Sequence, residues 1–384
     1  MRIPLFKPNF GKEEEEALIK VIRSGWIAQG IQVKLFEEKI AEHIRIEHDR
    51  VVALSSGTAA LHLALICAGI SAGDEVLVPS MGFVATAEAV VYCNAVPVFV
   101  DVDKWLHTSD IKDFENKLTN KTRAIMPVHV YGRMAPMDKL TDWARDKGLI
   151  VIEDSAPAFG AELSGKAAGL WGDYGCYSLQ SSKPLTAGDG GILITPNKEK
   201  GDEARCLRFQ GANVWDFTEI DFTGFWEEDF IKLGYSYRMT DLQAAVGLVQ
   251  LKRYSEITSK KVDLFTQYNK LLSSATDKIF LPPEDINNWP STNALQQYIV
   301  VIKDGGKEKR DCIVKEARKR GIFLMNGGYC LPSHSIWRNC GFDINDEEFP
   351  SAIFARDSTL SLPLYVGLKQ TEVKEVCDLL LEMV

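Results

Sequence analysis

The stretch GCYSLQSSKPLTAGDGGILIT, residues 175–195, joins two short apolar runs through a loop of small and polar residues. The runs GCYSLQ (175–180) and GGILIT (190–195) have the length and apolar content of strands that are covered on both faces. No helix-sized segment separates them, so we expect them to pair antiparallel. The one lysine of the stretch, Lys183, lies in the loop between them.

Upstream of this stretch, short apolar runs alternate with helix-sized segments such as PMDKLTDWARDKG, residues 136–148. This alternation is typical of a parallel or mostly parallel α/β sheet with helices on both faces. The runs are EVLVPS (75–80), VPVFVDVD (96–103), RAIMPVHVYG (123–132) and LIVIEDS (149–155).

From about Thr240 the pattern changes to a long helical stretch that ends near residue 272. After the loop 281–293 come an alternating strand, a helix from about residue 306 and a final amphipathic helix. We therefore predict a large domain over residues 1–245, followed over 246–384 by a connector helix and a small α+β domain. Within the large domain, we expect segment 1–25 to pack on the small domain.

Composition excludes several classes of protein. The 44 basic and 53 acidic side chains leave a net charge of −9, whereas a nucleic-acid binder usually carries a basic face. The eight cysteines form no CxxC pair or Cys/His cluster, and His43 and His48 lack a carboxylate partner at helical spacing, so we expect no metal. Without eighteen uninterrupted apolar residues or a signal peptide, we expect a soluble cytoplasmic protein with no membrane partner.

Ligands of open α/β sheets bind where the strands end, so polar residues after the apolar runs are candidates. Ser56, Gly57 and Thr58 open a helix whose free N–H groups suit a phosphate, with a plain serine N-cap as the alternative. Glu153 and Asp154 terminate a strand, where a carboxylate is either a cap for the next turn or a functional anion.

Two further candidates follow other strands. The ring of Phe83 lies just after a strand end and suits a planar ligand, with a place in the core as the alternative. Lys183 in an enclosed loop loses hydration, which lowers its pKa and leaves a neutral amine that attacks carbonyls. A solvated surface lysine is the alternative.

Together these groups meet the needs of one cofactor, pyridoxal phosphate. It requires a phosphate cradle, an aromatic plate, a carboxylate that keeps the pyridine nitrogen protonated and a lysine that holds the aldehyde. The four segments supply one of these groups each.

The sequence resembles the DegT/DnrJ/EryC1/StrS sugar aminotransferases, which are pyridoxal-phosphate-dependent enzymes of fold type I. The resemblance runs nearly end to end, through SGWIAQG, SSGTAALHLAL, VIEDSAPAFGA, GCYSLQSSKPLTAGDGGILIT and YRMTDLQAA among others. It implies a large domain with a mixed, mostly parallel seven-stranded sheet flanked by helices, and a smaller α+β C-terminal domain.

The resemblance also implies roles for single residues. Lys183 holds the cofactor aldehyde and shuttles a proton, Asp154 pairs with the pyridine nitrogen, and Phe83 stacks on the ring. The phosphate is bound at Ser56, Gly57, Thr58 and Ser178. Such enzymes are homodimers with active sites at the interface, where the segment around Ser236 reaches the partner's cofactor. Lys183 excludes the related sugar dehydratases, which carry histidine there.

The implied reaction passes an amino group, through a pyridoxamine phosphate form, from an amino-acid donor, glutamate, to a keto-sugar acceptor. The acceptor is a nucleotide-linked 3- or 4-keto sugar, with a keto-inositol, an octulosonate or an aromatic amino acid precursor as alternatives. The candidate acceptor contacts, each with a packing role as the alternative, are Trp26, Tyr131, Tyr329 and His334.

The chain departs from the family pattern at Gly82, Pro157, Phe159 and Ser236. Two functions from other classes remain open. A nicotinamide-dependent oxidoreductase lacks support, because the first strand–helix junction has no GxGxxG motif and GDGG (188–191) lies between strands. A non-catalytic regulator that binds pyridoxal phosphate is disfavoured by the intact Lys183 and Asp154.

Overall fold

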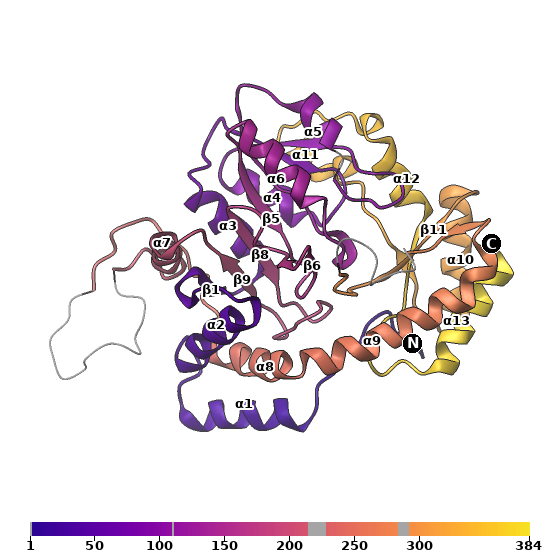
Figure 1. The fold of residues 1–384 in the computed structure, drawn as a ribbon, viewed down its shortest axis with the longest axis horizontal. Helices are drawn as coiled ribbons and strands as arrows, with labels where there is room; N and C mark the ends of the chain where they lie inside the picture. The colour runs from indigo at the N-terminus through magenta and orange to yellow at the C-terminus, as the bar shows by residue number, and fades with distance from the viewer. Residues whose placement is uncertain (1, 110, 214–227, 283–291) are drawn as a thin grey trace.

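A seven-stranded sheet forms the centre of the N-terminal part of the chain in the computed structural model, which describes residues 2–109, 111–213, 228–282 and 292–384 (Figure 1). The strand order is β1-β9-β8-β5-β4-β2-β3. The strands are β1 (Val51–Leu54), β2 (Glu75–Pro79), β3 (Val96–Val100), β4 (Thr122–Ile125), β5 (Ile150–Asp154), β8 (Tyr174–Ser178) and β9 (Gly191–Ile194).

The sheet is mostly parallel, as predicted. Neighbours from β3 through β2, β4 and β5 to β8 pair in parallel, whereas β9 pairs antiparallel with both β8 and β1. The antiparallel pairing predicted for 175–180 and 190–195 is confirmed, with Gly175 opposite Ile194 and Ser178 opposite Gly191. Because β9 runs against both neighbours, β1 and β8 point the same way and end at the same edge.

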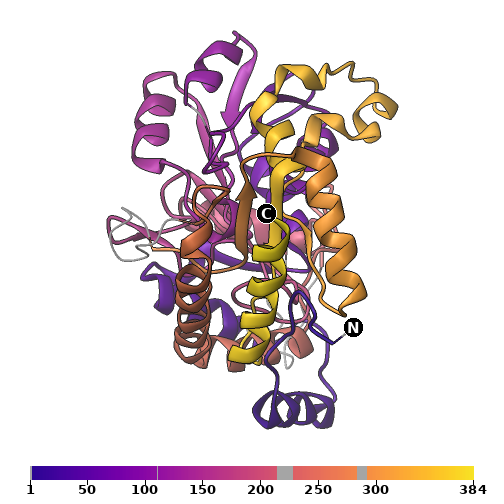
Figure 2. The same cartoon turned by 90° about the vertical axis from the view of Figure 1, so that its right-hand side faces the viewer.

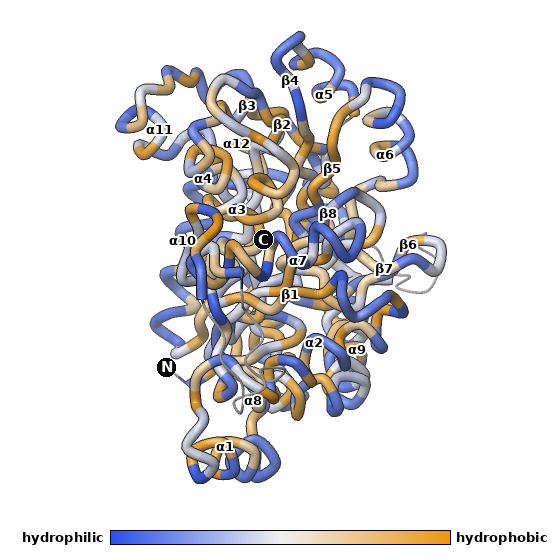
Figure 3. Tube along the Cα trace, turned by 90° about the vertical axis from the view of Figure 1, so that its left-hand side faces the viewer, coloured by the Kyte–Doolittle hydropathy of each residue, from blue (hydrophilic) through white to orange (hydrophobic). Residues whose placement is uncertain are grey.

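Helices cover both faces of this sheet because successive strand residues point to opposite sides. Val76 and Val78 pack in one core with α3 and α4, whereas Leu77 packs in another with α5 and α6. Figure 3 shows β5 in hydrophobic colours and α6 with long hydrophilic stretches, as expected for a covered strand and a surface helix. The helices are α2 (Ile31–Ile44), α3 (Gly57–Cys67), α4 (Ala85–Tyr92), α5 (Ile111–Lys117), α6 (Met137–Asp146) and α7 (Lys198–Arg208).

A four-stranded antiparallel sheet, ordered β10-β11-β13-β12, forms the C-terminal part with its own core. Its strands are β10 (Ile279–Phe280), β11 (Tyr298–Ile302), β12 (Met325–Asn326) and β13 (Thr359–Leu362). Its helices are α10 (Gly306–Lys319), α11 (Ser335–Asn339), α12 (Pro350–Ser358) and α13 (Gln370–Met383). A separate hairpin pairs β6 (Glu162–Leu163) with β7 (Lys166–Ala167).

Strand β11 differs from the alternating strand that its sequence predicts, because all five of its residues are buried. Tyr298 and Val300 pack in the small core, whereas Ile299 on the other face joins the core under α3 and α4 of the large sheet. The strand therefore has no solvent face. Most of the predicted loop 281–293, residues 283–291, lies outside the described residues.

The predicted long helical stretch is two helices, α8 (Asp241–Lys252) and α9 (Tyr254–Leu272), which run one after the other along the lower edge in Figure 1. They meet at Arg253, whose guanidinium donates to the Asn9 carbonyl at 3.2 Å and pairs with Glu14 at 2.8 Å. This contact with the N-terminal segment fixes the junction.

Segment 1–25 divides between two neighbours. Ile3 pairs with Ile322 beside the small sheet, and α1 (Lys12–Ser24) packs against α8. Figure 2 shows α1 set apart from α10 and α13, so it does not lie on the small sheet. The boundary near residue 245 stays a prediction.

A buried ion pair ties β1 to the helices around it. One carboxylate oxygen of Glu37 in α2 accepts from the Ala53 amide at 2.8 Å and from Arg208 of α7 at 2.7 Å. Arg208 also donates to the Ala53 carbonyl at 2.8 Å. Since β1 leads directly into the start of α3, this contact also fixes where that helix begins.

We expect Glu37→Gln to lower the free energy of unfolding by about 3 kcal/mol or more, because it leaves the buried Arg208 guanidinium without its carboxylate. The control is Glu42→Gln on the same helix, which breaks an exposed pair with Lys39 and should cost less than about 1 kcal/mol. Urea unfolding followed by circular dichroism measures both. Equal shifts for the two variants would contradict the role assigned to Glu37.

Candidate active site

The predicted site residues meet at one edge of the large sheet. Strands β1, β2, β5 and β8 all end at this edge, because they point in the same direction. Ser56 and the start of α3 follow β1, Phe83 follows β2, Asp154 ends β5, and Lys183 follows β8. The edge is thus the place where an open α/β sheet binds its ligands.

The start of α3 packs tightly on the end of β8. Ser56 caps the helix, its hydroxyl accepting from the Ala59 amide at 3.1 Å. A Cβ on Gly57 would lie 2.8 Å from the Ser178 Cβ, so only glycine lets the helix start approach Ser178 this closely. Thr58 is half-buried in the first turn. The free N–H end of α3 and the Ser178 hydroxyl therefore border one small space suited to a phosphate.

The glycines after Lys183 have a related role. Gly188 and Gly190 have φ values of +84° and +145°, which other residues rarely adopt. A Cβ on Gly191 would lie 2.1 Å from the Ser56 carbonyl oxygen. The turn therefore lets β9 pass directly beside the start of α3.

The two carboxylates at the end of β5 have different roles. Glu153 is buried and accepts from His129 Nε2 at 2.9 Å and from the amides of Gly169 and Gly172 at 2.9 and 2.6 Å. His129 Nδ1 accepts from the Ala135 amide at 3.1 Å, so the ring proton lies on Nε2 and faces Glu153. These bonds make Glu153 a structural residue.

Asp154 points to the opposite face of the sheet. Its carboxylate accepts from the Thr86 hydroxyl at 2.6 Å and from the Ala156 amide at 3.1 Å. Sequence reasoning missed Thr86, whose only signal is its place three residues after Phe83 at a helix start. Two fixed donors hold this buried carboxylate in one orientation, with its charge available to a ligand.

Phe83 is 64% exposed, which excludes the alternative of a core phenylalanine. Its carbonyl lies 3.1 Å from the Thr86 hydroxyl, so the same residue that orients Asp154 also adjoins the backbone that carries the ring. An exposed aromatic face and an oriented carboxylate therefore come from neighbouring positions.

Lys183 is half-buried in a loop fixed by its own hydrogen bonds. Its amide donates to the Gln180 carbonyl at 2.8 Å, and the Gln180 side chain accepts from the Ser182 amide at 2.8 Å. Burial lowers the pKa of the Lys183 amine below its ordinary value of 10.5, and the charge of Asp154 opposes that shift. This shelter favours the nucleophilic amine over a solvated surface lysine.

Three of the proposed acceptor contacts lie near the loop that carries Phe83. Cys330 pairs with Met81, which brings the segment of Tyr329 and His334 beside the end of β2. Tyr131 lies there too, with its hydroxyl 3.9 Å from the Met81 sulfur. It is buried, so it packs in the core rather than lining an open surface.

Trp26 and Ser236 are the remaining predicted contacts. Trp26 is 48% exposed and donates to the Gln29 carbonyl at 2.9 Å. Ser236 is exposed and accepts from Arg238 at 3.0 Å. Their roles toward a substrate or a second subunit stay predictions.

The structure explains one departure from the family pattern, Phe159. Phe159 is buried and stacks on His43 with ring centroids 5.3 Å apart, so it belongs to the core rather than to the ligand edge. A Cβ on Gly82 would meet Val128 at an ordinary 3.6 Å, so the space around this position does not require glycine.

The sequence pattern of the DegT/DnrJ/EryC1/StrS aminotransferase family matches residues 8–381. The chain belongs to this family. It is therefore an aminotransferase of a pyridoxal-phosphate-dependent group, and the resemblance found in its motifs is confirmed. Its mixed seven-stranded sheet with flanking helices is the large-domain sheet of fold type I.

Named relatives cover nearly the whole chain. The dTDP-4-dehydro-2,3,6-trideoxy-D-glucose 4-aminotransferase of Saccharopolyspora spinosa is 32% identical over 98% of this chain and 95% of its own. The GDP-perosamine synthase of Caulobacter vibrioides is 32% identical over 98% and 96%. The PLP-form of the putative sugar aminotransferase Spr1654 from Streptococcus pneumoniae has a TM-score of 0.89 at 26% identity, over 100% and 99% of the two chains.

The described ranges contain neither a membrane-spanning helix nor a cluster of metal-ligating side chains. There, no helix combines the length and the apolar character that crossing a membrane requires. The same residues contain no group of three or more His, Cys, Asp or Glu side chains that could hold a metal ion.

We expect Thr86→Val to weaken the binding of added pyridoxal phosphate by about tenfold, because Asp154 loses a charge-assisted hydrogen bond that orients it. The unfolding free energy should also fall by about 1.5–3 kcal/mol. Absorbance titration with the cofactor and urea unfolding measure the two effects.

Thr86→Ser keeps the hydroxyl and serves as the matched control, with cofactor affinity near that of the unchanged protein. A valine variant that binds the cofactor as tightly as the serine variant would show that Thr86 does not position Asp154.

Proposed function

We propose that this chain binds pyridoxal phosphate at the edge described above and transfers an amino group from glutamate to a nucleotide-linked 3- or 4-keto sugar. The observation that carries the proposal is the combination of Lys183, sheltered and with a lowered pKa, and Asp154, oriented by Thr86, at the same strand ends. The product of this transfer is an amino sugar.

The residues present fit the cofactor. The start of α3 and Ser178 would hold its phosphate, since the glycine at position 57 leaves their donors next to one another. The exposed ring of Phe83 would cover one face, Asp154 would bind the ring nitrogen, and Lys183 would bind the aldehyde. When bound, the cofactor supplies an electron sink and a carbonyl that carries the amino group between substrates.

Lys183 performs the proton transfer in this scheme. Its neutral amine at Nζ takes the proton from the donor's α-carbon and returns a proton to the acceptor's carbon, so the donor leaves as a 2-oxo acid and the keto group becomes an amine. Burial supports this role because it lowers the pKa of the amine and so raises the neutral fraction near neutral pH. Asp154, held by Thr86 and Ala156, would face the ring nitrogen.

The acceptor class rests on the relatives. The Saccharopolyspora enzyme is a 4-aminotransferase of a dTDP-linked dehydro sugar, and the Caulobacter enzyme makes GDP-perosamine. These names support a nucleotide-linked keto sugar over a keto-inositol or an octulosonate. Glutamate as donor is inferred from the family resemblance.

We also propose that the enzyme acts as a homodimer. Large apolar side chains are exposed along α1 and the segment that follows it, namely Ile19, Ile22, Trp26, Ile27 and Ile31. A soluble monomer rarely exposes so many large apolar side chains in one stretch of chain, and a second copy of the chain would cover them. The exposed Ser236 would then lie in the segment that reaches the partner's cofactor.

The unchanged protein should incorporate pyridoxal phosphate covalently, and borohydride reduction followed by mass spectrometry should place the adduct on Lys183. The rate of capture should rise with pH and level off below 10.5, because the pKa of this amine is lowered and only its neutral form attacks. Amino transfer from glutamate to a panel of nucleotide-linked keto sugars, followed by chromatography, tests the reaction.

Lys183→Ala should give neither adduct nor product, whereas Lys260→Ala, which alters an exposed lysine, should give both. Product formation by the Lys183→Ala protein at the rate of the unchanged protein would refute the proposed chemistry.

Light scattering should give a particle mass close to twice the chain mass of 42.8 kDa. Ile22→Glu, which places a charge in the exposed apolar patch, should shift the mass toward that of one chain, and Lys20→Gln on the same helix should not. A monomeric unchanged protein at micromolar concentration would refute the dimer.

A further inference from the structure

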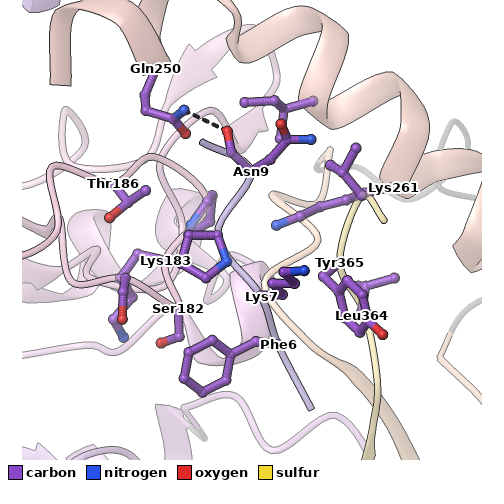
Figure 4. A pocket seen from close by; sticks show the side chains of 15 residues that line it. Phe6, Lys7, Asn9, Ser182, Lys183, Thr186, Gln250, Lys261, Leu364 and Tyr365 are labelled. Atoms are coloured by element: carbon purple, nitrogen blue, oxygen red, sulfur yellow. Dashed lines mark hydrogen bonds between the residues drawn. The ribbon is translucent and has the colours of Figure 1, made fainter. Parts of the chain in front are cut away.

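A pocket lies against the Lys183 loop, between this loop and three segments from elsewhere in the chain (Figure 4). It holds about 400 Å³ of empty space, part of it open to solvent. The four segments are the N-terminal residues 6–9, the loop 181–186, helices α8 and α9, and residues 364–366 after β13.

The charged side chains of this pocket are all cations. Lys7, Lys183 and Lys261 line it, and among the described lining residues there is no Asp or Glu. The other lining residues are apolar or neutral, so nothing in the described lining offsets this positive charge. Such a pocket attracts an anion.

Lys261 is the central feature. It is only 9% exposed, and in the part of the chain that the structure describes its amine has no hydrogen-bond or ion-pair partner. Figure 4 shows the amine pointing into the pocket, toward Asn9 and Lys7. The next residue on the helix, Lys260, is exposed and pairs with Glu256. Because the side chain is largely buried, its ammonium is only partly hydrated in the pocket, and a bound anion would offset that loss of hydration.

We propose that Lys261, assisted by Lys7, forms an anion subsite that holds a carboxylate or phosphate group of a substrate reacting at Lys183. This inference rests on the proposed function, because the aminotransfer reaction supplies both candidate groups. One is a carboxylate of the amino-acid donor, and the other is the diphosphate of a nucleotide-linked acceptor. An ammonium binds either oxygen anion through charge-assisted hydrogen bonds.

The side-chain amide of Gln250, which also lines the pocket, is not available to bind the anion. Gln250 is engaged, since its side chain donates to the Asn9 carbonyl at 3.0 Å and to Glu14 at 2.7 Å. The other titratable groups that face the pocket are Lys7 from the N-terminal segment, Lys183 from its loop and Tyr365 after β13.

Burial lowers the pKa of Lys261 to about 8. Anion affinity should therefore be full well below pH 8 and fall as the pH rises through that value.

Binding of succinate and of inorganic phosphate, measured by calorimetry on protein loaded with pyridoxal phosphate, tests the subsite. The bound cofactor keeps phosphate out of its own phosphate position. Lys261→Met should weaken the binding of at least one anion by about tenfold or more and remove its pH dependence around pH 8. Lys260→Met, the matched control, should bind as the unchanged protein does.

The two sources of the anion give different kinetics. If the donor supplies it, Lys261→Met raises the KM for glutamate by about tenfold with little change in kcat; if the acceptor does, the KM for the keto sugar rises instead. Lys261→Arg keeps the charge and should retain most of the anion affinity, which separates loss of charge from loss of folding. Thermal unfolding of Lys261→Met without anion should be no lower than that of the unchanged protein.

The proposal is overturned if Lys261→Met binds both anions with unchanged affinity and leaves both KM values unchanged. Failure of the proposed function looks different. In that case the unchanged protein shows no amino transfer, while the succinate and phosphate titrations of the unchanged, Lys260→Met and Lys261→Met proteins still decide whether the anion site exists.

Discussion

The start of α3 lies so close to the ends of β8 and β9 that a side chain at Gly57 or Gly191 would overlap Ser178 or the Ser56 carbonyl. This close packing brings the N–H end of a helix, a serine hydroxyl and the lysine loop to one edge of the sheet. The Glu37–Arg208 pair holds β1 at Ala53, near the end that leads into that helix. The phosphate position of the site thus depends on the absence of two side chains.

The two carboxylates at the end of β5 have different roles, one structural and one directed at the ligand edge. Glu153 and Asp154 are adjacent, so they point to opposite faces of the sheet. Glu153 is fully engaged by His129 and two backbone amides, which ties neighbouring loops together. Asp154 receives only the donors that orient it, and its charge is left for the ligand edge.

Burial lowers the pKa values of Lys183 and Lys261. The charges around the two lysines differ, and so do the roles that we assign to them. Lys183 lies near the Asp154 carboxylate, which partly restores the pKa of its amine, so it can exchange a proton during a reaction. Lys261 lies in a pocket whose other described charges are positive. Lys183 lines the same pocket, and this places a reacting amine beside an anion-attracting space.

The sequence by itself determined the alternation of strands and helices, the antiparallel turn around Lys183 and the strand-end positions of Asp154, Phe83 and the helix start. These follow from local periodicity and from the rule that sheet ligands bind at strand ends. Only the tertiary structure decided that Thr86 orients Asp154 and that Lys261 meets Lys183 across a pocket. These contacts join residues 68 or more positions apart, and no local pattern encodes which distant side chains come to share a space.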